Sequence, residues 1–139
     1  MSANGNSHAQ CAIGPSDEFD LTLRAIAMPA DANPAGNIFG GWVMSQMDLA
    51  AYVRACEMAK RRTVTVAVKE MSFAKPVKIG DTVCIYTSLI RLGRSSVELA
   101  VQVWTRRALS PKMEKVTEGQ FVMVAVDADG NSTAVYSRG

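Results

Sequence analysis

One long stretch of helical periodicity constrains the possible folds of this chain more than any other feature. The stretch begins at Gly40 and ends at about Arg62. Its apolar positions recur at helical spacing, at Val43, Met47, Ala50 and Ala51. A helix of some twenty residues would be about 30 Å long, enough to cross a small domain. Because its first half is largely apolar, we expect the helix to be mostly buried, with a basic last turn that suits the helix dipole.

The segments on either side of this helix alternate with a period of two, which predicts β-strands. One strand is expected before the helix and four after it, at residues 19–28, 63–73, 81–91, 97–104 and 115–128. One apolar helix against an antiparallel sheet is an α+β arrangement, and the order fits the hotdog fold, a curved sheet wrapped around one long central helix. We therefore expect a single domain at residues 19–130, with a disordered tail at 1–18 and a C-terminal tail at 131–139.

The composition argues against several classes of protein. A formal net charge of +2 over 139 residues is too small to indicate a nucleic-acid-binding protein. Cys11, Cys56 and Cys84 are odd in number and far apart, which argues against a disulfide framework and a zinc site. Residues 1–18 lack the apolar stretch of a signal peptide, and no run approaches the ~20 apolar residues that span a bilayer. We expect a cytoplasmic protein without stable membrane insertion.

The single histidine, His8, lies in the predicted tail. A Ser-His-Asp or Cys-His mechanism therefore has no candidate base in the folded region, and a histidine-rich metal site is excluded for the same reason. If the chain is an enzyme, its carboxylates, amides and backbone groups must carry the chemistry, and no metal site is expected.

Asp48 is the only charged residue between Asp31 and Arg54, and it lies about two turns into the predicted helix. A desolvated carboxylate is costly unless a partner or a function holds it in place. However, Ser45, Asp48 and Tyr52 could also form a helical face that simply meets solvent. Spacing alone slightly favours this second, structural explanation.

The approach to the helix offers further candidates that are ambiguous as single residues. Gly40 and Gly41 leave the amides of the helix N-terminus accessible, which would suit a developing oxyanion, although glycine is common at helix starts. Asn33 lies in a loop where asparagine also favours turns for local reasons. The turn at Arg94, Ser95 and Ser96 could contact phosphate, but its pattern is not specific.

The continuous stretch at residues 28–48, MPADANPAGNIFGGWVMSQMD, gives these residues a common context. It closely resembles the signature of bacterial YciA-type acyl-CoA thioesterases, within the wider cytosolic acyl-CoA hydrolase family. The pattern combines Asp-x-Asn, a glycine-containing loop, Phe-Gly-Gly and an apolar helix that carries an aspartate. In this chain the corresponding residues are Asp31, Asn33, Gly36, Phe39, Gly40, Gly41 and Asp48. Shorter similarities follow, and the resemblance covers residues 19–130.

The resemblance implies a hotdog fold in which two protomers join their sheets and form active sites at the interface. The homodimers would assemble further into a hexamer, a trimer of dimers. The family's catalytic aspartate falls on Asp48 and its asparagine on Asn33, and the two groups that face one thioester would come from different subunits.

The activity implied is hydrolysis of acyl-CoA, with no cofactor besides the CoA of the substrate. Asp48 would act as general base on a water or attack the thioester directly. The amides of Gly40 and Gly41 would form the oxyanion hole, and Arg94, Ser95 and Ser96 would contact CoA. Two alternatives stay open, namely a non-catalytic acyl-CoA sensor and a thioesterase that acts on acyl-carrier-protein.

Overall fold

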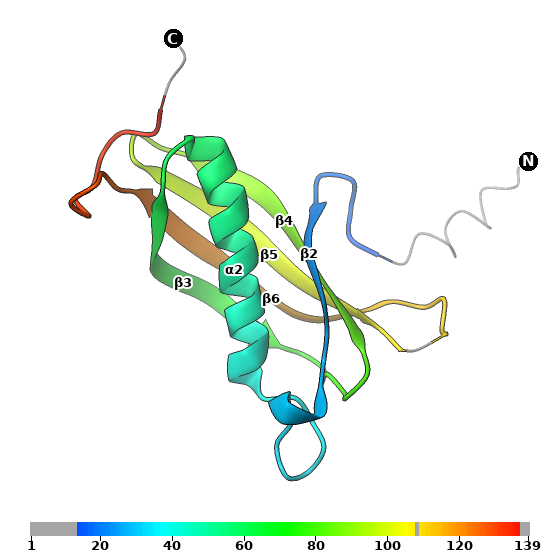
Figure 1. The fold of residues 1–139 in the computed structure, drawn as a ribbon. Coiled ribbons are helices and arrows are strands. Elements are labelled where there is room, and N and C mark those ends of the chain that lie inside the picture. The colour runs from blue at the N-terminus through cyan, green and yellow to red at the C-terminus, as the bar shows by residue number, and fades with distance from the viewer. Residues whose placement is uncertain (1–13, 108, 137–139) are drawn as a thin grey trace, which may run out of the picture.

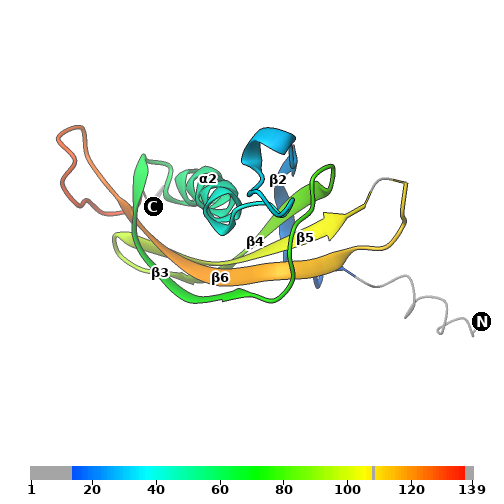
Figure 2. The same cartoon turned by 90° about the horizontal axis from the view of Figure 1, so that it is seen from below.

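The computed structural model describes residues 14–107 and 109–136, which form one curved antiparallel sheet and one long helix (Figure 1). The elements are β2 (Asp20–Ile26), the short 3₁₀ turn η1 (Pro29–Asp31), α2 (Gly40–Ala59), β3 (Thr63–Phe73), β4 (Thr82–Leu92), β5 (Ser96–Arg106) and β6 (Glu114–Ala125). The strand order is β2-β4-β5-β6-β3, and every neighbouring pair is antiparallel. Figure 2 shows the sheet curving around α2, which confirms the predicted α+β hotdog arrangement.

The helix packs on the sheet through small side chains. Its fully buried residues include Met47 and four alanines, at positions 50, 51, 55 and 59. The remaining surface is more open than the sequence indicated, because Leu49, Tyr52 and Val53 are all exposed. The expectation of a largely buried helix is therefore correct for only one face.

The helix ends at Ala59, three residues earlier than predicted. Lys60 adopts a left-handed conformation, with φ of 55° and ψ of 33°, and its amide donates a hydrogen bond to the Cys56 carbonyl. This conformation terminates the helical ladder. The predicted basic last turn is therefore wrong, since Lys60, Arg61 and Arg62 lie just beyond the helix.

The inner face of the sheet shows the predicted alternation. In β5, the alternating residues Val97, Leu99, Val101 and Val103 are fully buried. In β4, Val83, Ile85 and Thr87 are likewise buried, but Cys84 on the opposite face is buried as well. The first predicted strand is shorter than expected, because the chain leaves β2 at Ile26 and Pro29 begins η1.

The edge strand β3 contains two irregularities in its pairing with β6, one between Thr65 and Ala67 and one between Lys69 and Ser72. At the second, Glu70 has a positive φ of 55°. The Met71 side chain lies over Gly119, where an added Cβ would be only 2.9 Å from the Met71 methyl carbon. Each bulge changes which residues of β3 face the helix.

The C-terminal residues 131–136 lie across the end of α2 (Figure 1). The Val135 amide donates to the Arg94 carbonyl, and the Tyr136 amide donates to the Ala59 carbonyl. These bonds bring the β4–β5 turn and the helix end together. His8 and Cys11, in the predicted N-terminal tail, lie outside the described residues.

A buried carboxylate fixes the connection from β3 to β4. Asp81 is 1% exposed, and its Oδ2 accepts a hydrogen bond from the Lys78 amide at 2.9 Å. Its Oδ1 pairs with Arg107 Nε at 3.1 Å. The same connection holds the loop before α2, because the Ile38 amide donates to the Val77 carbonyl.

Replacing Asp81 with alanine is expected to lower the free energy of unfolding by about 3 kcal/mol, since it leaves the partly buried Lys78 amide without its acceptor and Arg107 without its partner. Urea unfolding measures this loss. Arg107→Gln is the matched control, with a smaller expected effect because the Arg107 side chain is 56% exposed. An equal or larger loss in the control would contradict the assignment of the buried carboxylate as the anchor.

Candidate active site

A hollow of about 390 Å³ lies between α2 and the edge strand β3. Its lining residues are Gly41, Met44, Ser45 and Asp48 from the helix, Thr65 and Val68 from β3, and Phe121 from β6. Met44, Val68 and Phe121 give the hollow an apolar floor. Asp48 is the only charged residue among the lining residues, so a carboxylate meets an apolar cavity at this place.

The Asp48 carboxylate is held by a neighbouring hydroxyl. Thr65 Oγ1 donates to Asp48 Oδ1 at 2.5 Å and also lies 3.4 Å from Met123 Sδ. Oδ2 of Asp48 accepts no hydrogen bond from residues 14–107 or 109–136. The other hydroxyl of the hollow, Ser45 Oγ, donates to the Trp42 carbonyl at 2.7 Å. One carboxylate oxygen is thus held by Thr65, and the other has no hydrogen-bond partner among the described residues.

The bulges in β3 place its residues in this hollow. Thr65 and Val68 are three positions apart, and strict alternation would put them on opposite faces of the sheet. The irregularity between Thr65 and Ala67 adds one residue, so both side chains face the helix.

Two amides at the start of α2 are available for a ligand. The amides of Trp42 and Val43 donate to the Phe39 carbonyl. The amides of Gly40 and Gly41 have no acceptor within the described part of the chain. A Cβ on Gly41 would meet nothing within 4 Å, whereas one on Gly40 would lie 3.4 Å from the Phe73 ring. The open side of the helix N-terminus is therefore at Gly41, which lines the Asp48 hollow.

Asn33 lies in the loop before α2 and is not among the residues that line the hollow of its own chain. Its Oδ1 accepts hydrogen bonds from the amides of Ala35 and Asn37, at 2.9 and 3.0 Å. Lys78 Nζ donates to Asn37 Oδ1 at 2.6 Å and ties this loop to the segment before β4. The loop is thus held at both ends, and Asn33 keeps its side-chain nitrogen free of partners among the described residues.

Arg94 and Ser95 lie at the other end of the helix, in the turn between β4 and β5, and Ser96 begins β5. The Ser95 carbonyl accepts from the Ala125 amide, and the Arg94 carbonyl accepts from the Val135 amide. None of the three lines the Asp48 hollow. Within one chain, the predicted CoA contacts and the predicted catalytic groups are therefore at different places along α2.

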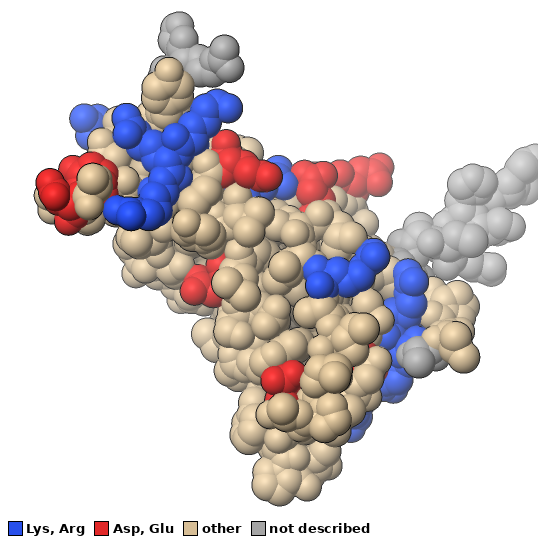
Figure 3. Space-filling view, viewed as in Figure 1, with Lys and Arg blue, Asp and Glu red and all other residues tan. Residues whose placement is uncertain are grey.

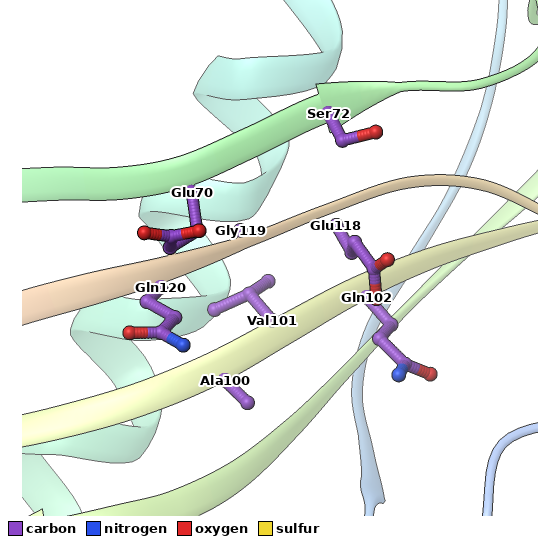
Figure 4. A pocket seen from close by; sticks show the side chains of 8 residues that line it. All are labelled: Glu70, Ser72, Ala100, Val101, Gln102, Glu118, Gly119 and Gln120. Atoms are coloured by element: carbon purple, nitrogen blue, oxygen red, sulfur yellow. The ribbon is translucent and has the colours of Figure 1, made fainter.

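A second hollow of about 390 Å³ lies on the opposite face of the sheet (Figure 4). Its lining includes two carboxylates, Glu70 and Glu118, and two amide side chains, Gln102 and Gln120. Lys115 Nζ already pairs with Glu118 at 3.1 Å. The hollow contains none of the predicted site residues, so we place the candidate site at Asp48.

Sequence reasoning missed Thr65, Met44, Val68 and Phe121. Alternation predicts that Thr65 shares a face with Thr63, but it does not say which residue of the helix that face meets. The position of Val68 depends on the bulge, for which the sequence carries no clear signal. Within residues 14–107 and 109–136, no group of three or more His, Cys, Asp or Glu side chains could hold a metal ion. No described helix has the length and apolar character needed to cross a bilayer.

Comparisons with known proteins identify the family of this chain. The model of the thioesterase superfamily matches residues 35–110. The acyl-CoA thioester hydrolase YciA of Salmonella typhimurium is 46% identical over 114 residues, which cover 80% of this chain and 86% of that protein.

Solved structures give the same result. A hexameric thioesterase from Yersinia pestis superposes with a TM-score of 0.83 at 43% identity, covering 88% of this chain and 100% of that one. A hexameric hotdog-fold thioesterase of Campylobacter jejuni has a TM-score of 0.81 at 36% identity, over 87% and 93% of the two chains. The chain therefore belongs to the YciA-type acyl-CoA thioester hydrolases of the thioesterase superfamily.

Proposed function

We propose that this protein hydrolyses acyl-CoA thioesters to free CoA and a carboxylic acid, with Asp48 as its catalytic carboxylate. The observation that carries the proposal is a carboxylate in an apolar hollow, with one oxygen held by Thr65 and the other without a partner in the described chain. The activity named for YciA of Salmonella typhimurium supports the choice of substrate.

In the proposed reaction, Asp48 Oδ2 takes a proton from a water molecule while the water oxygen attacks the thioester carbonyl carbon. The tetrahedral intermediate then collapses, the carbon–sulfur bond breaks, and the CoA thiolate receives the proton. Direct attack by Asp48 would instead form a mixed anhydride that water then hydrolyses. Both routes require Asp48 and use no metal or redox cofactor.

The amides of Gly40 and Gly41 are proposed to stabilise the developing oxyanion. Both amides lack an acceptor within the described chain, and both lie at the positive end of the helix dipole. Donors of this kind contribute about 3–4 kcal/mol of transition-state stabilisation in comparable enzymes.

We propose a homodimer as the smallest active unit, with Asn33 reaching the Asp48 site of the partner subunit. β3 is an edge strand that pairs only with β6, and all its residues except Thr63 and Met71 are exposed. Val64, Val66 and Phe73 on this strand are 43%, 55% and 49% exposed. An apolar edge of this kind is suited to pair with a second copy. The hexameric relatives support a trimer of such dimers as the complete assembly.

The first test is release of free CoA from a panel of acyl-CoAs, from acetyl to palmitoyl. Asp48→Asn is expected to lower kcat by about 10² to 10⁴, because it removes the proton acceptor and keeps the shape of the side chain. Glu57→Gln, on the exposed side of the same helix, is the matched control and is expected to keep wild-type turnover.

Near-normal turnover in the Asp48→Asn protein would contradict the assignment of Asp48 as the catalytic carboxylate. If the wild type binds acyl-CoA but releases no CoA, the sensor alternative is correct. Activity only toward acyl groups on acyl-carrier-protein would establish the other alternative.

Thr65 is proposed to orient the Asp48 carboxylate without touching the substrate. Thr65→Val keeps the shape of the side chain and removes the hydroxyl, so we expect kcat to fall by about tenfold with little change in KM. Thr65→Ser keeps a hydroxyl at this position and should retain most of the wild-type kcat. Thr22→Val is the control at the opposite sheet edge, where it removes a hydroxyl bond to Thr87 of 2.6 Å. Equal effects of the two valine variants would show a general effect on the fold, and the orienting role would then be rejected.

Charge on the outer edge of β3 should dissociate the assembly. We expect the Val66→Glu protein to be monomeric, as measured by light scattering. We also expect it to hydrolyse no acyl-CoA, because each monomer would lack the half of the site that the partner supplies. Leu109→Glu, in the β5–β6 connection, adds the same charge at a fully exposed position and should change neither property. An active Val66→Glu monomer would contradict a shared site.

A further inference from the structure

The loop before α2 contains a small hairpin at residues 32–38, the Asn33 hairpin. Ala32 and Ile38 form an antiparallel bridge at its base. The Asn33 amide donates a hydrogen bond to the Asn37 carbonyl at 2.7 Å. The hairpin projects from the end of the molecule where α2 begins (Figure 1). Its internal shape is therefore set by bonds between its own residues.

The same hairpin sets the orientation of the Asn33 side chain. The backbone amides of Ala35 and Asn37 donate to Asn33 Oδ1 at 2.9 and 3.0 Å. Because a backbone amide can only donate, these two bonds assign the oxygen of the side chain to the hairpin and leave its nitrogen for a group outside. The place of this nitrogen in an assembled site therefore depends on where the whole hairpin lies.

Contacts with the segment before β4 determine where the Asn33 hairpin lies. The Ile38 amide donates to the Val77 carbonyl at 2.9 Å, and Asn37 forms a β-bridge with Lys78. The side chains add one bond, from Lys78 Nζ to Asn37 Oδ1 at 2.6 Å. Within the described part of the chain, no other side-chain hydrogen bond joins the hairpin to another segment.

Lys78 brings a charge to a hairpin that has none. Residues 32–38 contain no charged side chain, and they form an uncharged tip at the lower end of the molecule in Figure 3. No carboxylate of the described residues lies within ion-pair distance of Lys78 Nζ, so no acidic side chain competes with Asn37 for the ammonium group. Hydrogen bonds with one charged partner are roughly twice as strong as neutral ones.

Asn37 connects Lys78 to Asn33 directly. Its side-chain oxygen accepts from Lys78 Nζ, and its backbone amide donates to Asn33 Oδ1. Lys78 is itself held by Asp81, which is 1% exposed. The Lys78 amide donates to Asp81 Oδ2 at 2.9 Å, and the Asp81 amide donates to the Lys78 carbonyl at 3.0 Å. A connected set of hydrogen bonds therefore extends from a buried carboxylate to Asn33.

We propose that Lys78 is a positioning residue that, through Asn37, holds the Asn33 hairpin where Asn33 meets the thioester. This inference rests on the proposed function, in which Asn33 serves the Asp48 site of the partner subunit. A catalytic group that is misplaced by about 1 Å can lower the rate on the order of 10²-fold. Lys78 therefore acts on turnover without touching the substrate.

The test measures kcat and KM with the acyl-CoA that the wild type hydrolyses fastest. Lys78→Met keeps the length of the side chain and removes its charged donor, so we expect kcat to fall about five- to tenfold while KM stays within about twofold of wild type. Lys78→Arg keeps a charged donor and should retain most of the wild-type kcat. Lys115→Met is the matched control, because it removes a lysine that donates to Glu118 at 3.1 Å, and it should change neither constant.

Two combined variants separate positioning from a general effect on the fold. Asn37→Leu removes the acceptor, and adding Lys78→Met to it should lower kcat no further, because both changes remove the same contact. In an Asn33→Ala protein, Lys78→Met should likewise cause no further loss, since the residue that it positions is absent. An unchanged kcat in Lys78→Met or additive losses in either combination would overturn the inference. A rise in KM alone would also overturn it, because that result indicates direct contact between Lys78 and the substrate.

Amide hydrogen exchange separates this inference from the proposed reaction. The Ile38 amide donates to the Val77 carbonyl and therefore reports whether the hairpin lies against the segment before β4. Peptides that cover residues 32–38 should exchange about five- to tenfold faster in Lys78→Met than in wild type or Lys115→Met, as measured by mass spectrometry. If the wild type hydrolyses no thioester yet exchange rises in this way, the reaction is wrong and the placement of the hairpin by Lys78 stands. If hydrolysis is normal and Lys78→Met changes neither kcat nor exchange, the positioning role is wrong and the reaction stands.

Discussion

The close approach of α2 to the concave face of the sheet is the contact on which the other features of this protein depend. Four buried alanines and Met47 let the helix lie near the buried valines and leucine of β5. Larger side chains at these alanine positions would have to force the two layers apart, since protein cores are close-packed. The short separation between helix and sheet is also what brings a helical carboxylate within hydrogen-bond distance of a strand hydroxyl.

The candidate site lies on the part of the helix surface that the sheet does not cover. Its inner face is buried against the sheet, whereas the face toward β3 stays open and includes Asp48 and Tyr52. β3 runs along this face, and its pairing with β6 is interrupted twice. The first interruption turns Val68 toward the helix, and the second lies where Met71 packs over Gly119, which has no side chain to resist it. The candidate site and the irregular pairing of β3 with β6 therefore occur at the same place in the fold.

Periodicity predicted the helix, the strands and the α+β arrangement, because an element with one buried face has apolar residues at regular intervals in its sequence. It located Asp48 correctly on the helix but left its surroundings undetermined, since these depend on the register of a strand that is distant in sequence. The bond from Thr65 needs the packing partner of its strand face, and the inward position of Val68 needs the bulge between Thr65 and Ala67, which no pattern in residues 63–73 indicates. The helix end was misplaced for a local reason, because Lys60 takes a left-handed conformation for which glycine is the usual signal. The link between the β4–β5 turn and the helix end was equally hidden, because it runs through hydrogen bonds from the Val135 and Tyr136 amides.

The irregular course of β3 also governs how this chain meets its neighbours. A long, straight, apolar edge strand can pair repeatedly with other molecules and lead to aggregation. The bulges of β3 interrupt the segments that remain regular, so we expect a partner strand to add only over a limited length. Closed assembly of a few subunits is then favoured over open-ended growth, although the edge is exposed in each separate chain. The irregularity that shapes the candidate site is thus also expected to limit the size of the proposed assembly.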